Sequence, residues 1–172
     1  MIKLSKILLE NDMIMGSAPK KIPSEICWHL SEKKRSTFPD FGFHIGTELQ
    51  ALDRGKFMLY HEMADDMENL VFYLHKVKIN PSAEIYPDIL FDDPEEGYTI
   101  PSDQIDKNKI YFYENGHEGL NGPKPNLSIY TSGNNIKLVQ IIKLDTKGYE
   151  DGESEFDKKF NSTPNTIDPH TL

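Results

Sequence analysis

The sequence has one cysteine, no long apolar run and no excess of basic residues. Because Cys27 is alone, no disulfide can form within the chain, and its position beside Trp28 in an apolar run favours a buried thiol. A membrane helix needs about 20 consecutive apolar residues, and no window of the sequence approaches this. In the apolar N-terminal segment, polar residues 10–12 interrupt any core of the signal-peptide kind. These absences predict a cytoplasmic protein without a membrane partner.

Positive charge is also scarce. The 172 residues include 28 acidic side chains against 19 lysines and arginines, which gives a formal net charge of −9. A negative surface repels phosphate backbones, which disfavours nucleic acid as a partner. The one basic cluster, Lys33-Lys34-Arg35, is typical of a solvated loop. The charge favours a basic protein partner and leaves open an acidic inhibitor that mimics nucleic acid, which would need evenly spaced carboxylates along one face.

Several catalytic motifs are missing. His61-Glu62 followed by Asp65 lacks the second histidine of the zinc-protease pattern, so we expect no metal. The glycine-rich loops that hold phosphates are absent, and so is the nucleophile elbow of hydrolases. These absences count against metalloproteases, kinases, classical dehydrogenases and α/β-hydrolases.

The chain is long enough for one hydrophobic core. We expect an amphipathic N-terminal segment over residues 1–18, a single α/β domain over 19–146 and an acidic tail over 147–172. The tail has few apolar residues and many acidic, Pro, Ser, Thr and Asn residues, which predicts a flexible segment. Such a tail, with Phe156 and Phe160, could fold against a partner, and the N-terminal segment could provide a second attachment point.

Alternating apolar residues predict the strands. The most secure covers 69–80, with Tyr73, His75, Val77 and Ile79 on one face. Further strands are expected at 25–30, 41–47 and 110–113. Segments 127–131 and 136–144 are interpreted as a hairpin. The proline-punctuated stretch 82–109 is expected to hold at most short helices near 87–91 and 102–106.

One helix start is clear from the sequence. Thr47, followed three residues later by Gln50, forms a capping box that predicts a helix beginning at Glu48. Gly55 is expected to interrupt this helix, which then resumes through residue 67. Together with the predicted strands, it indicates the α+β class.

Polar residues at the predicted strand ends follow a particular order. Trp28-His29-Leu30-Ser31 comes first, then the run Gly42 to Thr47 (GFHIGT) before a helix with Ala51. Val77-Lys78-Ile79-Asn80-Pro81 and the turn Asn115 to Gly119 come next. This order, over roughly residues 25–140, resembles small, often phage-encoded, ADP-ribosyltransferase-like domains. The resemblance implies a bent, mostly antiparallel sheet that is split into two packed halves, with short peripheral helices.

The resemblance also implies NAD as the ligand and a macromolecular acceptor for ADP-ribose. Cleavage of the nicotinamide–ribose bond passes through an oxocarbenium-like state, so a carboxylate is needed near the ribose. Glu118 is the candidate for that carboxylate and Glu114 the reserve, while His29 would bond a ribose. The other residues placed along the NAD are Ser31, His44, Gly46, Thr47 and one stacking aromatic, Tyr60 or Tyr73.

Each candidate also has a purely structural interpretation. His29 could be a satisfied core histidine, His44 a cap or a sheet-edge residue, and Glu118 a solvated loop acid. Leu30 stands where the family has a glycine, which lets the backbone approach the nicotinamide amide. The alternative function is therefore a non-catalytic virion-associated or interaction protein that kept the same fold and binds other virion proteins through its two ends.

Overall fold

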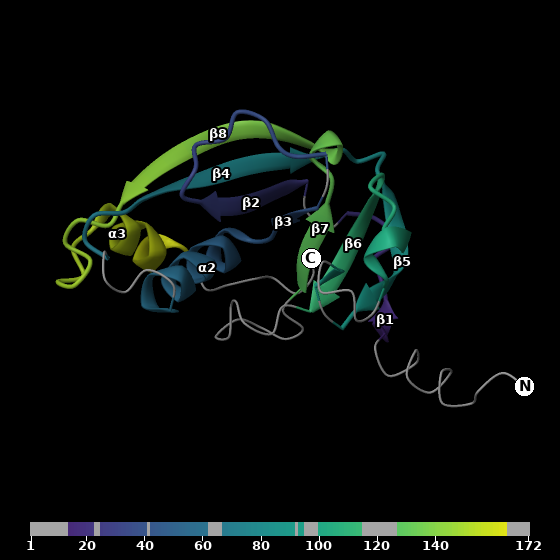
Figure 1. Ribbon diagram of the computed structural model, residues 1–172, viewed down its shortest axis with the longest axis horizontal. Helices are drawn as coiled ribbons and strands as arrows, with labels where there is room; N and C mark the ends of the chain where they lie inside the picture. The colour runs from purple at the N-terminus through teal and green to yellow at the C-terminus, as the bar shows by residue number, and fades with distance from the viewer. Residues whose placement is uncertain are drawn as a thin grey trace, which may run out of the picture.

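Figure 1 shows the computed structural model, which describes residues 14–22, 25–40, 42–61, 67–91, 93–94, 100–114 and 127–164. Within these residues the strands form a five-stranded sheet in the order β1-β5-β6-β7-β3 and a three-stranded sheet in the order β2-β4-β8. All pairings are antiparallel except that of β5 with β6. The chain is therefore mixed α/β, as the sequence predicts.

The bounds of the elements follow. The strands are β1 (Ile14–Ser17), β2 (Ile26–Ser31), β3 (Phe43–Ile45), β4 (Val71–Ile79), β5 (Glu84–Leu90), β6 (Lys109–Glu114), β7 (Leu127–Thr131) and β8 (Ile136–Asp145). The helices are α2 (Glu48–His61), α3 (Glu155–Ser162) and the short 3-10 helices η3 (Ser102–Gln104) and η4 (Gly133–Asn135). No helix of the described part is long and apolar enough to cross a membrane.

Helix α2 begins where the capping box predicts. The Thr47 amide donates to Gln50 Oε1 over 2.7 Å, and the Gln50 amide donates to Thr47 Oγ1 over 3.2 Å. Gln50 is only 2% exposed, and its side-chain amide also donates to the Leu127 carbonyl over 2.8 Å. The cap therefore fixes the helix start and ties it to β7.

The expected interruption at Gly55 is wrong, because α2 runs unbroken from Glu48 to His61. Gly55 faces the core, and a Cβ atom there would lie 2.7 Å from Phe156 Cε2 and 3.2 Å from Leu30 Cδ2. The glycine thus permits close packing of α2 against α3 and β2. Residues 62–66, where the helix was expected to continue, lie outside the described residues.

The three-stranded sheet is covered on both faces, at different ends. Val77 pairs with Cys27 and belongs to the core between the two sheets, together with Phe43. Leu74 pairs with Leu30 and belongs to a second core, under α2 and α3. β4 therefore has the predicted alternation and in addition buries residues of its other face under the helices.

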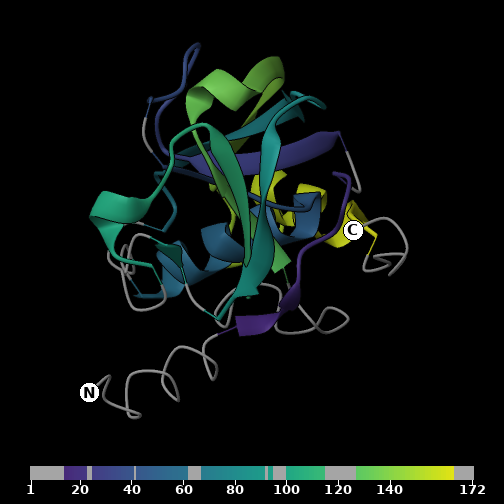
Figure 2. The same cartoon turned by 90° about the vertical axis from the view of Figure 1, so that its right-hand side faces the viewer.

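A third core lies on the outer face of the five-stranded sheet. It contains Tyr111, Tyr113 and Tyr130, while the intervening residues Ile110 and Phe112 belong to the core between the sheets. Figure 2 shows the outer face of the five-stranded sheet toward the viewer, with the helices behind it. The five-stranded sheet is therefore buried on both faces.

The flexible tail expected over 147–172 is wrong up to residue 164. Phe156 of α3 is fully buried and packs against Phe72. Ser154 caps the helix by accepting the Asp157 amide over 3.0 Å. The segment before it is held by Glu68, whose carboxylate accepts the amides of Gly148 and Glu150 over 2.6 and 2.8 Å. Residues 147–164 thus belong to the fold, and 165–172 lie outside the described residues.

The structure also differs from the predictions in three further segments. β7 pairs with β3 and β6, whereas β8 pairs with β4, so 127–144 is no hairpin and η4 carries the chain from one sheet to the other. The stretch 84–90 is strand β5 rather than a short helix. Pro87 is accommodated where the β5–β6 register shifts, and its carbonyl accepts the Ala18 amide over 2.7 Å. Residues 14–17, within the expected amphipathic N-terminal segment, form strand β1, and residues 1–13 lie outside the described residues.

Candidate functional site

The two sheets meet where β2, which carries His29, runs beside β3, which carries His44 (Figure 1). Trp28 and Gly46 exchange backbone hydrogen bonds of 2.9 and 3.0 Å. One residue further along β2, His29 Nδ1 lies 2.9 Å from the His44 carbonyl oxygen. The GFHIGT segment, which contains β3, is thus hydrogen-bonded to β2.

The hydrogen bond to His44 fixes the tautomer of His29. A carbonyl only accepts, so Nδ1 carries the proton and Nε2 has a lone pair. Nε2 is buried and has no hydrogen-bond partner among the described residues. Burial is the main cause that lowers the pKa of His29 from 6.5 to about 3. The imidazole is therefore neutral near pH 7 and offers a hydrogen-bond acceptor.

Ser31 and Tyr73 share a face with His29. In the β2–β4 ladder His29 lies opposite His75, and Ser31 lies opposite Tyr73. Ser31 Oγ donates to the Lys33 carbonyl over 2.8 Å, so this hydroxyl stabilises the start of the following loop. The structure thus brings together the predicted residues His29, Ser31 and Tyr73.

Leu30 lies on the opposite face of β2. Its side chain is 5% exposed and packs in the core under α2 and α3. The Leu30 side chain, which stands where the resembled domains have a glycine, therefore does not occupy the face that His29 shares with Tyr73.

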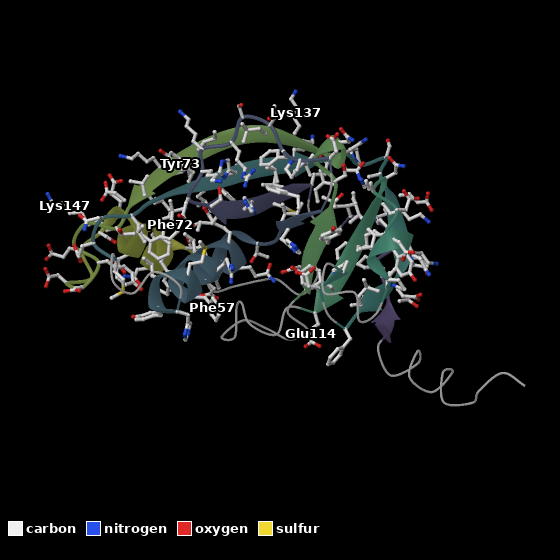
Figure 3. The ribbon with its side chains drawn as sticks, viewed as in Figure 1. Phe57, Phe72, Tyr73, Glu114, Lys137 and Lys147 are labelled. Atoms are coloured by element: carbon white, nitrogen blue, oxygen red, sulfur yellow. The ribbon has the colours of Figure 1, made fainter. Side chains whose placement is uncertain are left out.

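Gly46, Thr47 and Glu114 form a separate group near the start of α2. A Cβ at Gly46 would lie 2.5 Å from Gln50 Oε1, so the cap leaves no room for a side chain. Glu114 pairs with Leu127, whose carbonyl accepts the Gln50 side chain. Figure 3 shows Glu114 at the lower edge of the five-stranded sheet, far from Tyr73 at the top. Glu118 lies outside the described residues.

The side chains of His44 and Tyr60 lie elsewhere. His44 packs on the outer face of the five-stranded sheet, where Nδ1 is 2.9 Å from the Tyr113 hydroxyl and Nε2 is 3.4 Å from Asp93 Oδ2. Tyr60, on α2, is 61% exposed and lies near the Tyr149 ring. The structure does not bring these two side chains to His29.

Two residues beside His29, Arg35 and His75, are not among the site candidates that the sequence provides. The His75 ring centroid lies 5.9 Å from that of His29, and the Arg35 amide donates to His75 Nε2 over 3.0 Å. Arg35 Nε is buried, although the sequence pattern indicates a solvated loop. Only the register of β2 against β4 could have identified this group, and a single sequence does not give it.

Within the described residues, no three His, Cys, Asp or Glu side chains gather so as to hold a metal ion. Comparison of the chain with protein-family models, with curated proteins and with solved structures gave no match. The functional interpretation therefore depends on the chemistry of the residues and on the resemblance described above.

Proposed function

We propose that this protein binds NAD beside the junction of β2 and β3 and transfers ADP-ribose to a macromolecular acceptor. The supporting observation is His29, whose neutral imidazole presents Nε2 as an acceptor without a partner among the described residues. A ribose hydroxyl is a hydrogen-bond donor that fits this atom. The ADP-ribosyltransferase-like fold is part of the proposal, and two sheets with mostly antiparallel pairings are compatible with it.

The reaction requires two further contributions from the chain. A carboxylate, from Glu118 or Glu114, would bond the ribose 2′-hydroxyl and offset the positive charge that develops as the nicotinamide–ribose bond breaks. The bonding electrons leave with nicotinamide, and an acceptor group forms the new bond to the ribose and loses its proton. A basic protein acceptor suits the net charge of −9.

Calorimetry of NAD binding to the purified protein, followed by a nicotinamide-release assay in the same sample, tests this proposal. We expect binding that His29→Ala weakens, with His61→Ala as the matched control, because His61 is an exposed histidine at the far end of α2. Glu118→Gln should abolish release without a loss of stability, since the sequence predicts a turn here and an exposed carboxylate in a turn would contribute little to folding. If Glu118→Gln leaves release unchanged, Glu114→Gln tests the reserve.

A second function is favoured by a different observation. β8 lies at the edge of the three-stranded sheet, and the side chain of Val139 in this strand is 52% exposed. An edge strand can pair with a strand of a partner, which suits a non-catalytic virion-associated or interaction protein. No NAD binding at millimolar concentration, weaker than about −4 kcal/mol, would favour this alternative.

A further inference from the structure

Three buried polar atoms without hydrogen-bond partners among the described residues belong to one cluster. They are His29 Nε2, Arg35 Nε and His75 Nδ1. A fourth buried atom, Glu48 Oε1, differs from these three because the Lys159 ammonium lies 2.6 Å away and pairs with it. Because nearly all buried polar groups in proteins have partners, three orphaned atoms in one place call for a common explanation.

The three side chains come from neighbouring elements. His29 and His75 lie directly opposite one another on β2 and β4, with ring centroids 5.9 Å apart. Arg35 reaches them from the loop 32–40, whose backbone is attached to His75 by the Arg35 amide. The charge of Arg35 acts on both imidazoles and helps to lower the pKa of each, after burial.

The donors and acceptors of this cluster follow from its hydrogen bonds. His75 Nε2 accepts the Arg35 amide, so Nδ1 carries the proton and is a donor. Burial lowers the pKa of His75, and the nearby backbone of His29 and Tyr73 raises it in part. No described atom makes a hydrogen bond of ordinary geometry with Nδ1. Arg35 Nε is a second donor, and His29 Nε2 is an acceptor.

We propose that His29, Arg35 and His75 bind the vicinal diol of a ribose. One hydroxyl donates to His29 Nε2, and the diol oxygens accept from Arg35 Nε and His75 Nδ1. A fully ionised anion such as sulfate has only acceptors and would leave His29 Nε2 unpaired. The inference rests on the proposed function, to which it adds Arg35 and His75 as binding residues and the diol as the group that is recognised.

The loop 32–40 covers this diol site. The Phe38 ring packs 4.5 Å from Phe43 and 5.9 Å from His75, and the Pro39 carbonyl accepts the Gly133 amide over 2.8 Å. Because the three orphaned atoms are buried, the ligand enters when this loop lifts and the Arg35 amide leaves His75. The loop then closes over the ribose.

The test compares two nucleotides that differ only in the diol. Imidazole nitrogen signals of His29 and His75 are followed by NMR while the full chain is titrated with ADP, with 2′,3′-dideoxy-ADP and with sodium sulfate. We expect ADP to shift both histidines and the dideoxy nucleotide to bind more weakly by about tenfold or more. Arg35→Lys, which keeps the charge and loses Nε, should weaken ADP similarly, whereas Lys34→Ala in the same loop should not.

Three results would overturn the diol site. They are equal responses to ADP and its dideoxy analogue, the same shifts with sulfate, and no response to any probe at about 10 mM, well above a millimolar dissociation constant. The last result would mean that water or small rearrangements satisfy the three atoms. If ADP binds through its diol but NAD is not cleaved, the proposed transfer fails and the site stands. If NAD is cleaved while His29 and His75 do not respond, the transfer stands and the site fails.

Discussion

At the scale of the residue, the protonation of His29 makes the free energy of unfolding depend on pH. Its pKa is lowered from 6.5 to about 3 in the folded chain, mainly by burial. Unfolding therefore takes up a proton at any pH between these values, and stability falls as the pH drops below about 6.5. The slope per titrating group approaches about 1.4 kcal/mol per pH unit. The pKa of His75 is shifted in the same direction, which adds to the slope.

Urea unfolding at a series of pH values from 7 to 4, with and without His29→Asn, measures this contribution. The asparagine amide can still donate to the His44 carbonyl but does not titrate. We expect the variant to lose stability less steeply with acid than the wild type. Equal slopes would show that His29 titrates in the folded chain much as it does in the unfolded one.

Gly55 provides a second test at this scale. Alanine is the better helix former by about 1 kcal/mol, yet a Cβ at this position would lie 2.7 Å from the buried ring of Phe156. We expect Gly55→Ala to lower the free energy of unfolding by about 1–3 kcal/mol, as overpacking usually does. The same substitution in a Phe156→Leu background should cost less, because the smaller side chain leaves room. A stabilising Gly55→Ala would contradict the close packing.

At the scale of the element, Phe156 is the apolar side chain of α3 that is fully buried in the core under the helices, and Phe160 packs against the same core. We expect Phe156→Ala to destabilise the protein by about 3–5 kcal/mol. Asn161→Ala on the exposed side of the same helix is the matched control and should change stability little. Thermal and urea denaturation measure both, and equal small effects would mean that α3 is only loosely attached.

Local patterns predicted some elements well. The capping box of Thr47 and Gln50 gave the start of α2, and the alternation through Val77 and Ile79 gave β4. Both signals are complete within a few residues of the chain. The interruption at Gly55 was wrong because a glycine that provides room for a neighbour has the same local appearance as one that ends a helix.

Other elements could not be predicted because their partners are distant in the sequence. The pattern of 127–144 indicates two strands but not that they belong to different sheets. The apolar residues of the expected tail are few, and a count does not reveal that Phe156 is buried. For the candidate site, the resemblance singled out His29, whereas Arg35 and His75 were found only through the β2–β4 register and the path of the loop.

At the scale of the whole molecule, the sheets and helices share contiguous cores. β4 contributes Val77 to the core between the sheets and Leu74 to the core under the helices. We therefore expect a single cooperative unfolding transition, because β4 joins the core under the helices to the core that both sheets share. Fluorescence of Trp28, which lies at the junction of the sheets, should change at the same urea concentration as far-UV circular dichroism. Two separated midpoints would contradict this coupling.

The lone thiol of Cys27 makes this junction accessible to chemical kinetics. Cys27 is 3% exposed in the core between the sheets, and burial raises its pKa to about 12. The thiolate, which is the reactive form, is therefore almost absent while the sheets are closed. A thiol reagent would modify the chain only during openings that separate β2 from the five-stranded sheet. Because the sequence has no second cysteine to compete for the reagent, the labelling rate would measure how often these openings occur. It would also show whether a bound nucleotide makes them rarer.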